Sequence, residues 1–138
     1  SVLIIEDDVD VVRFAVRALK KAEITENVIS LADGQRAVDY LLGSEEHELP
    51  RVVLLDLKLP VLSGHEVLKQ LRDNERTRTL PIVIFTSSHL PDDVRMCYQN
   101  GANSYVRKPV NYEEFRTAVC EVVRYWLGPN VPVVQDES

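Results

Sequence analysis

Short apolar runs and amphipathic helical patterns alternate five times along these 138 residues. The third run, Val52–Leu55, has four apolar residues in succession, which is typical of a strand buried on both faces of a parallel sheet. Strands that alternate with helices form such a sheet through right-handed crossovers, with helices on both faces. The pattern therefore predicts a doubly wound α/β domain. The predicted strands are Val2–Ile5, Val28–Leu31, Val52–Leu55, Pro81–Phe85 and Ser104–Arg107.

Capping residues mark where several of the intervening helices begin. Asp33 stands where an N-cap is expected, because its carboxylate can accept a hydrogen bond from the first helical turn. Ser63 with Glu66 has the spacing of a capping box. Asn111 repeats that spacing before a long helix that ends at Leu127. We therefore expect residues 1–127 to form one domain and residues 128–138 to form a C-terminal tail.

The composition excludes several classes of protein. The formal net charge is -6 and the sequence pI is about 5.1, which argues against a nucleic-acid-binding face. No run approaches the roughly 18 apolar residues of a membrane span, so we expect a soluble, cytoplasmic protein. Cys97 and Cys120 make no metal-binding spacing, and we expect both to be buried thiols.

Polar residues follow four of the predicted strands, and the carboxyl ends of parallel strands meet at one edge of a sheet. Crowded carboxylates repel one another unless a cation such as Mg²⁺ lies between them. A lysine and a hydroxyl suit an incoming phosphoryl group instead. The set therefore predicts a carboxylate that accepts a phosphoryl group beside Mg²⁺. Its members are Asp7, Asp8, Asp56, Thr86 and Lys108.

Each of these residues also has a simpler interpretation. Asp7 and Asp8 could place negative charge at the N-terminus of the following helix, where it is favourable. Asp56 could open a turn, Thr86 could end a strand, and Lys108 could be an ordinary surface lysine. All of these residues are expected at the same edge of the sheet. This favours a phosphoryl-accepting site over the separate alternatives.

With these residues in place, the chain resembles the receiver domain of two-component response regulators over essentially its whole length. The residues that carry the resemblance are Asp7, Asp8, Asp56, Pro60, Gly64, Thr86, Tyr105, Lys108 and Pro109. The family implies a flavodoxin-like sheet in the order 2-1-3-4-5 with five helices. It also implies that Asp56 takes a phosphoryl group from the phosphohistidine of a sensor histidine kinase. The implied Mg²⁺ ligands are Asp7, Asp8, Asp56 and the backbone carbonyl of Lys58.

The same resemblance implies a switch. Thr86 and Tyr105 would form the switch pair and change the face made by the fourth helix, the fifth strand and the fifth helix. The Lys108–Pro109 bond would be cis. The loop around Glu45–His47 and the tail make the chain similar to the small single-domain regulators that partner bacterial phytochromes. A phytochrome-type kinase is therefore the expected partner, and a downstream protein is the expected target.

The last helix has more apolar residues than packing on one sheet requires. This excess predicts a homodimer through the helix and the tail, although the tail could instead fold back over its own domain. The predicted core stripe is Phe115, Ala118, Val119, Val122 and Trp126. The residues expected outside it are Val123, Tyr125, Leu127, Val131, Val133 and Val134.

Two rival functions remain open at this point. An aspartyl-phosphate hydrolase resembling the haloacid dehalogenases would need an acid at the position of Lys58. A receiver-like module could bind partners without accepting a phosphoryl group, although the acids, Thr86 and Lys108 argue against it. His47, His65 and His89 have no ligand spacing, and we interpret them as surface residues.

Overall fold

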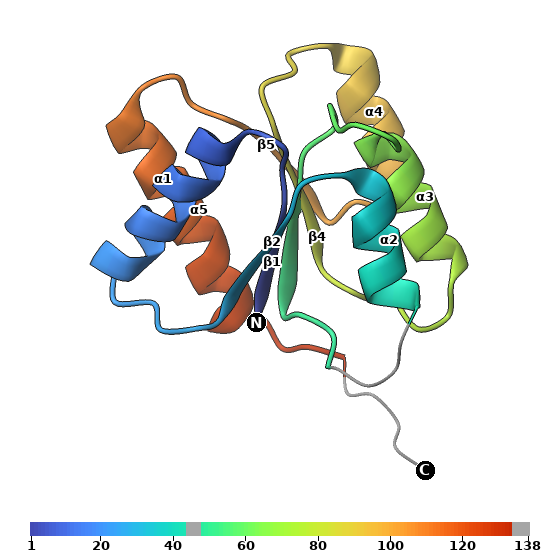
Figure 1. The fold of residues 1–138 in the computed structure, drawn as a ribbon, viewed down its shortest axis with the longest axis horizontal. Coiled ribbons are helices and arrows are strands. Elements are labelled where there is room, and N and C mark those ends of the chain that lie inside the picture. The colour runs from blue at the N-terminus through green and yellow to red at the C-terminus, as the bar shows by residue number, and fades with distance from the viewer. Residues whose placement is uncertain (44–47, 134–138) are drawn as a thin grey trace.

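The structure is a computed structural model that describes residues 1–43 and 48–133. Its centre is a parallel sheet in the strand order β2-β1-β3-β4-β5 (Figure 1). This order confirms the predicted flavodoxin-like, doubly wound fold. The strands are β1 (Val2–Ile5), β2 (Val28–Leu31), β3 (Val52–Leu55), β4 (Ile82–Thr86) and β5 (Ser104–Arg107).

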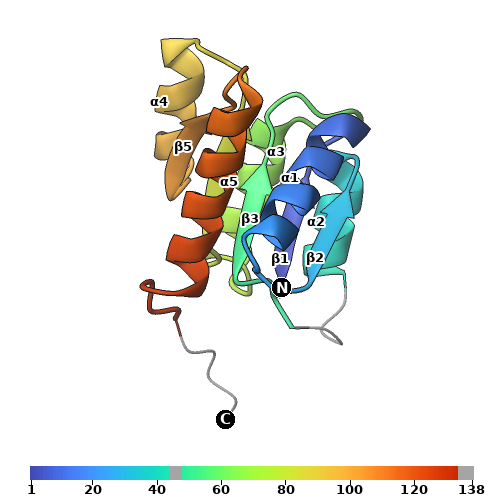
Figure 2. The same cartoon turned by 90° about the vertical axis from the view of Figure 1, so that its left-hand side faces the viewer.

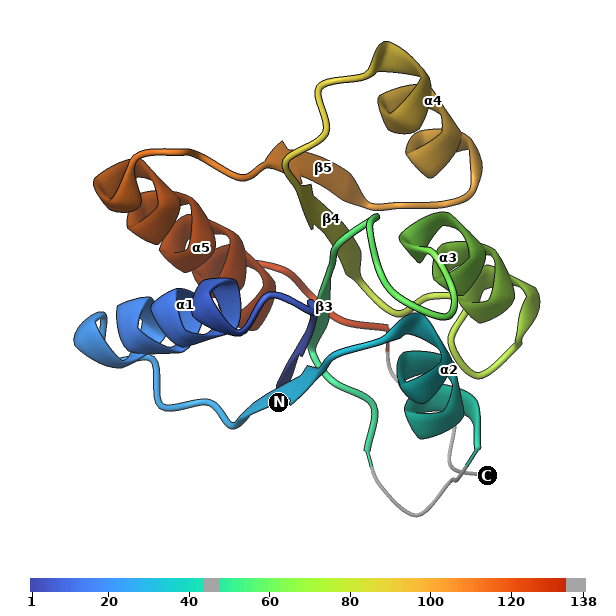
Figure 3. The same ribbon diagram turned by 45° about the horizontal axis from the view of Figure 1, so that its top comes forward.

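Helices cover both faces of the sheet. The first and last helices lie side by side on one face (Figure 2), and the other three lie on the opposite face (Figure 3). This arrangement follows from the right-handed crossovers that join successive parallel strands. The helices are α1 (Val9–Lys21), α2 (Gly34–Leu42), α3 (Gly64–Asp73), α4 (Pro91–Gln99) and α5 (Tyr112–Leu127).

The predicted capping residues all serve as N-caps. The backbone N of Arg36 donates to Oδ1 of Asp33 at 2.7 Å, at the start of α2. The backbone N of Glu66 donates to Oγ of Ser63 at 3.3 Å, at the start of α3. Asn111 accepts from two backbone N–H groups in the first turn of α5. Each cap satisfies donors that the first helical turn leaves without an intrahelical partner.

The core has two halves because successive strand residues point to opposite faces. Leu3 and Ile5 contribute to the half beneath α2, α3 and α4. Val2 and Ile4 contribute to the half beneath α1 and α5. Every residue of the three central strands β1, β3 and β4 is buried, whereas the edge strands β2 and β5 are partly exposed. The unbroken apolar runs of the sequence thus match strands that are covered on both faces.

The packing of α5 differs from the prediction at Val123 and also at Leu127, which is partly buried against the core. Val123 is buried, together with Phe115 and Val119, instead of extending beyond the core stripe. These three residues are spaced by four, so they lie on one face of the helix. Tyr125 is exposed, as are Val131 and Val133 in the tail; Val134 lies outside the described residues.

The Lys108–Pro109 bond is trans, because the described residues include no cis peptide bond. The prediction of a cis bond here is therefore wrong. The trans form of a bond before proline is intrinsically lower in free energy by about 0.5–1 kcal/mol, and the path from β5 to α5 accommodates it.

Two predictions from composition can be compared with the described residues. Cys97 and Cys120 are free and buried, as expected. None of the helices in the ranges 1–43 and 48–133 combines the length and the apolar character needed to cross a bilayer.

Candidate functional site

The site lies where β1, β3, β4 and β5 end, at one edge of the sheet. The backbone N of Asp56 donates to the carbonyl of Ile5 at 3.0 Å, which places the end of β3 beside the end of β1. The backbone N of Lys108 donates to the carbonyl of Thr86 at 2.7 Å, which does the same for β5 and β4. The parallel ladder therefore continues one residue beyond the strands and brings these side chains to a common edge.

Asp56 is held by contacts to both carboxylate oxygens. Oδ1 accepts a hydrogen bond from the backbone N of Leu57 at 2.8 Å. Oδ2 accepts one from Nζ of Lys108 at 3.1 Å. The residue as a whole is 7% exposed. Asp56 thus has a fixed orientation and little solvent around it, which is the arrangement required of a positioned nucleophile.

Three acids come together at this edge. One carboxylate oxygen from each of Glu6, Asp7 and Asp56 lies within 4.8 Å of the others. Glu6 is buried, whereas Asp7 is exposed and therefore open to solvent. A group of oxygen ligands that combines buried and exposed carboxylates fits a hard divalent cation that keeps part of its water shell.

Asp8, which belongs to the predicted set of Mg²⁺ ligands, lies outside this acid group. Its side chain accepts a hydrogen bond from the backbone N of Asp10 at 2.9 Å and forms the N-cap of α1. This role is close to the alternative interpretation of the sequence, in which Asp8 serves the helix N-terminus. The acid group contains Glu6 instead, a residue that is absent from the predicted set.

The sequence analysis left Glu6 out of the predicted set. Glu6, Asp7 and Asp8 are consecutive, so their order alone does not show which two of them face the site. The backbone N of Glu6 continues the ladder by donating to the carbonyl of Leu31 at 3.0 Å, and its side chain points into the site. The available signal was the helical run that begins at Val9, because it makes Asp8 the expected N-cap.

Lys108 links two of the acids electrostatically. Its ammonium contacts Oε1 of Glu6 as well as Oδ2 of Asp56. Burial raises the pKa of Glu6, and the hydrogen bond from Lys108 opposes that rise. Burial by itself would lower the pKa of Lys108, but the hydrogen bond to Glu6 and the charge of Asp56 raise it overall. Lys108 is therefore a firmly protonated cation between two carboxylates.

Thr86 and Tyr105 lie next to this group on β4 and β5. Thr86 is 1% exposed, and its Oγ1 has no hydrogen-bond partner among the described residues. The hydroxyl of Tyr105 donates to the carbonyl of Ser88 at 3.1 Å. A buried hydroxyl without a partner is unfavourable unless another group can bind it, so Thr86 is available as a donor.

A scan of family models matches residues 2–120 to the response regulator receiver domain. The chain belongs to the response regulator receiver family. As a receiver, it is a phosphoacceptor signalling protein.

Relatives of known sequence cover most of the receiver. The probable methanogenesis regulatory protein FilR2 of Methanothrix harundinacea is 42% identical over 131 residues, which are 94% of this chain and 84% of FilR2. The response regulator Rcp1 of Synechocystis is 33% identical over 129 residues, which are 91% of this chain and 88% of Rcp1.

Two solved structures have the same fold. The Mn²⁺-bound form of Rcp1 matches with a TM-score of 0.89 at 31% identity, covering 96% of this chain and 98% of that one. The phosphorylated cyanobacterial phytochrome response regulator RcpA matches with a TM-score of 0.90 at 26% identity, covering 96% of this chain and 97% of RcpA.

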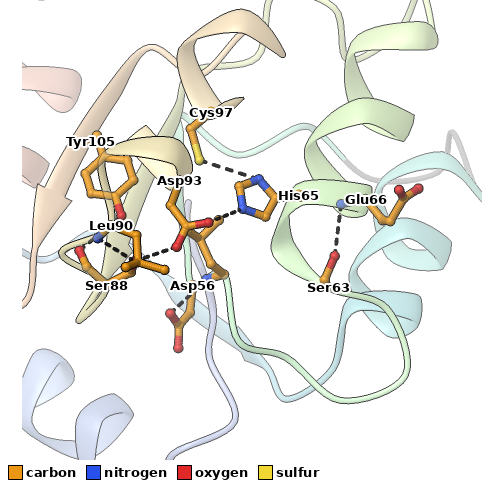
Figure 4. A network of polar contacts seen from close by, with 10 residues as sticks. Asp56, Ser63, His65, Glu66, Ser88, Leu90, Asp93, Cys97 and Tyr105 are labelled. Atoms are coloured by element: carbon orange, nitrogen blue, oxygen red, sulfur yellow. Dashed lines mark hydrogen bonds and ion pairs between the residues drawn. The ribbon is translucent and has the colours of Figure 1, made fainter. Parts of the chain in front are cut away.

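The receiver also contains a polar network that the sequence analysis missed (Figure 4). His65 is half-buried, and its Nε2 lies 3.0 Å from Oδ1 of Asp93. The interpretation of His65 as a surface residue is therefore revised, whereas His89 is exposed as expected and His47 lies outside the described residues. No sequence signal marks a pair 28 residues apart on two different helices.

Proposed function

We propose that Asp56 accepts a phosphoryl group from the phosphohistidine of a sensor histidine kinase in a Mg²⁺-dependent reaction. The observation that carries this proposal is the fixed Asp56 carboxylate, which lies beside Glu6 and Asp7 and is hydrogen-bonded to Lys108. Transfer breaks the phosphorus–nitrogen bond of the phosphohistidine and forms a phosphorus–oxygen bond to Asp56. Such a transfer depends mainly on positioning and on neutralising charge.

Glu6, Asp7 and Asp56 would hold the Mg²⁺ ion, because carboxylate oxygens and water are the ligands that it prefers. The backbone carbonyl of Lys58 remains a predicted further ligand. The bound ion would offset the negative charge that the acids and the phosphoryl group share. That a similar receiver, Rcp1, has a Mn²⁺-bound form supports the binding of a divalent cation.

Lys108 and Thr86 would bind the transferred group. The ammonium of Lys108 already lies 3.1 Å from Asp56 and can pair with a phosphoryl oxygen. The Thr86 hydroxyl can donate to another phosphoryl oxygen, which would satisfy a buried group that has no partner in the part of the chain that the structure describes. Movement of Thr86 would let Tyr105 reorient and would change the face made by α4, β5 and α5.

Label transfer from a phosphorylated histidine kinase tests this assignment. We expect the parent protein to acquire label only when Mg²⁺ is present, and Asp56→Asn to acquire none. Asp73→Asn is the matched control, since Asp73 is exposed at the end of α3. Undiminished labelling of Asp56→Asn would refute the proposal, and binding of beryllofluoride with Mg²⁺ would distinguish a phosphoacceptor from a module that only binds partners.

We further propose a phytochrome-type kinase as the partner. The similarity to RcpA, which is named a cyanobacterial phytochrome response regulator, supports this choice. The loop around Glu45–His47, which contributed to the same prediction, lies outside the described residues. Competing label transfer from a phytochrome kinase and from kinases with other sensors is the direct test. Faster transfer from a kinase of another sensor class would reject the phytochrome assignment.

We also propose that the chain forms a homodimer through α5 and the tail. Tyr125 is 50% exposed, and Val131 and Val133 in the tail are 86% and 61% exposed, so the described part of the tail leaves apolar surface uncovered. Sedimentation at tens of micromolar, with and without beryllofluoride, tests the dimer. Val131→Asp should weaken it and Val110→Asp, in the loop before α5, should not; a monomer under both conditions would remove the proposal.

A further inference from the structure

The β4–α4 loop, residues 87–90, is joined to α3 through a single carboxylate (Figure 4). Oγ of Ser88 in this loop donates to Oδ2 of Asp93 at 2.5 Å. The other oxygen of the same carboxylate, Oδ1, lies 3.0 Å from Nε2 of His65. Because Asp93 is in the first turn of α4 and His65 is in the first turn of α3, these contacts bridge two helices and the loop.

Ser88 also contacts Tyr105, one member of the proposed switch pair, and lies close in sequence to the other member, Thr86. Its carbonyl accepts the hydrogen bond from the hydroxyl of Tyr105 at 3.1 Å, and its Oγ accepts one from the backbone N of Leu90 at 3.3 Å. Ser88 is only two residues beyond Thr86, so Thr86 cannot move far unless the loop moves with it. A movement of the loop at Ser88 would therefore affect both the Tyr105 hydroxyl and the segment that follows Thr86.

Helix α4 depends on these polar contacts more than the other helices do. Cys97 is the only buried residue of its nine, whereas each of the other four helices buries three or four residues. Its N-cap, Leu90, makes no side-chain capping hydrogen bond. With little apolar burial to hold the start of the helix, the contacts of Asp93 contribute a larger share of its attachment.

The bridge is charged and partly shielded from water. The side chains of His65 and Asp93 are 19% and 25% exposed. The pKa of Asp93 is lowered by the hydrogen bond from Ser88, then by the contact with His65, and the charge of Lys58 adds to the effect. On its other side the imidazole packs on α4, where Sγ of Cys97 lies 3.8 Å from Nδ1. Asp93 is therefore an ionised acceptor held from both sides.

We propose that His65 is a positioning residue of the switch. By fixing the Asp93 carboxylate, it holds Ser88, and with it the Tyr105 hydroxyl and the segment after Thr86, in the observed arrangement. This restraint opposes the movement of the loop toward a phosphoryl group on Asp56, so the inference rests on the proposed function. Removing the imidazole should make binding of a phosphoryl analogue at Asp56 more favourable, because less restraint has to be broken.

The test compares beryllofluoride binding, with Mg²⁺ present, in five proteins by titration calorimetry: the parent, His65→Ala, Ser88→Ala, the double variant and His89→Ala. We expect His65→Ala to bind beryllofluoride about fivefold more tightly than the parent, which is the factor by which one hydrogen bond typically shifts an equilibrium. In a Ser88→Ala background, His65→Ala should have no further effect, because the link to the loop is already broken. His89→Ala is the matched control, since His89 is an exposed histidine of the same loop.

Asp93→Asn provides a second way to weaken the bridge, should His65→Ala fold poorly. It removes the charge that both partners bind, and it should also tighten beryllofluoride binding. Unchanged or weaker binding in a folded His65→Ala protein would overturn the inference. The same gain in the Ser88→Ala background would also overturn it, because His65 would then act by another route.

A measurement without any ligand separates this inference from the proposed function. The backbone amide of Leu90, which donates to Ser88, should exchange its hydrogen several-fold faster in His65→Ala than in the parent. If the parent protein binds no beryllofluoride, the proposed function fails. Amide exchange then tests by itself whether His65 restrains the loop. Faster exchange at Leu90 in His65→Ala supports the restraint, and unchanged exchange rejects it.

Discussion

Nζ of Lys108 lies 3.1 Å from Oδ2 of Asp56, and the same ammonium contacts Glu6. One cation thus balances two carboxylates that are 7% and 4% exposed. Loss of one partner from a buried ion pair is strongly destabilising, since the remaining charge keeps its desolvation penalty without compensation. Lys108 is therefore important for stability as well as for the proposed chemistry.

Replacing Lys108 with methionine should destabilise the fold by about 3 kcal/mol at pH 7. The pKa of Glu6 is already raised above 4.5 by burial, and loss of the ammonium should raise it further. A group with a raised folded-state pKa contributes stability below its ordinary pKa and loses it as the pH rises through the folded-state pKa. The deficit should therefore widen between about pH 4 and pH 7.

Urea denaturation of the parent and Lys108→Met across that pH range measures this deficit. Lys69→Met serves as the control, because Lys69 forms an exposed pair with Glu66 at 3.8 Å. Its effect should be below about 0.5 kcal/mol and nearly independent of pH. A constant deficit for Lys108→Met at all pH values would contradict the electrostatic explanation.

Substitutions of Asp7 and Asp8 should distinguish a residue of the proposed metal site from a residue that only caps a helix. We expect Asp7→Asn to weaken Mg²⁺ binding at least about tenfold, or about 1.4 kcal/mol, because it removes the charge of one of the three carboxylates proposed to hold the ion. Asp8→Asn should leave Mg²⁺ affinity within about twofold and stability nearly unchanged, because asparagine is an equally good N-cap. Calorimetric titration of Mg²⁺ measures the affinities; equal losses in the two variants would mean that Asp8 is a ligand.

Val61 is a site at which glycine should stabilise the protein. Its φ angle is 70°, and the backbone N of Leu62 donates to the carbonyl of Pro60 at 2.8 Å, so Val61 is the centre of a γ-turn. A β-branched residue is strained at positive φ. The side chain of Val61 is exposed and contributes little packing. We expect Val61→Gly to stabilise the fold by about 1 kcal/mol, the strain relieved minus the entropy that glycine adds to the unfolded chain.

Thermal and urea denaturation measure the effect of Val61→Gly. Val110→Gly is the control, because Val110 is also an exposed valine in a loop but has no positive φ angle. It should destabilise the protein by about 0.5–1 kcal/mol, because glycine raises the conformational entropy of the unfolded chain. Destabilisation by both substitutions would show that the backbone at Val61 is not strained.

Arg72 should contribute more to stability than an ordinary surface arginine. Its guanidinium donates to the carbonyls of Gly101 and Thr77 at 2.8 and 2.9 Å and to Oδ1 of Asn103 at 2.9 Å. Burial lowers its pKa, which indicates a partly desolvated cation. We expect Arg72→Met to cost about 2–3 kcal/mol in urea denaturation, since three acceptors lose a charged donor. Arg95→Met, in an exposed pair, should cost below about 0.5 kcal/mol, and equal losses would contradict this role.

The fold and the edge that carries the site could be predicted from local patterns. A run such as Val52–Leu55 is too apolar to face water, so it requires cover on both faces. Right-handed crossovers then place every strand end at the same edge, which is why Asp56, Thr86 and Lys108 could be expected to lie together. The strand order itself came from the family resemblance of these same residues.

The sequence by itself therefore determined the layers of this receiver and the position of the proposed acceptor, Asp56, at the end of a buried strand. Apolar runs and helical periodicity are local patterns, which can be recognised within a few consecutive residues. Only the tertiary structure placed Glu6, and not Asp8, in the acid group, since the hydrogen bond to Leu31 directs Glu6 inward and Asp8 caps the start of α1. Only the tertiary structure also brought His65 to Asp93. Contacts between distant elements depend on how the helices pack, and no local pattern records that packing.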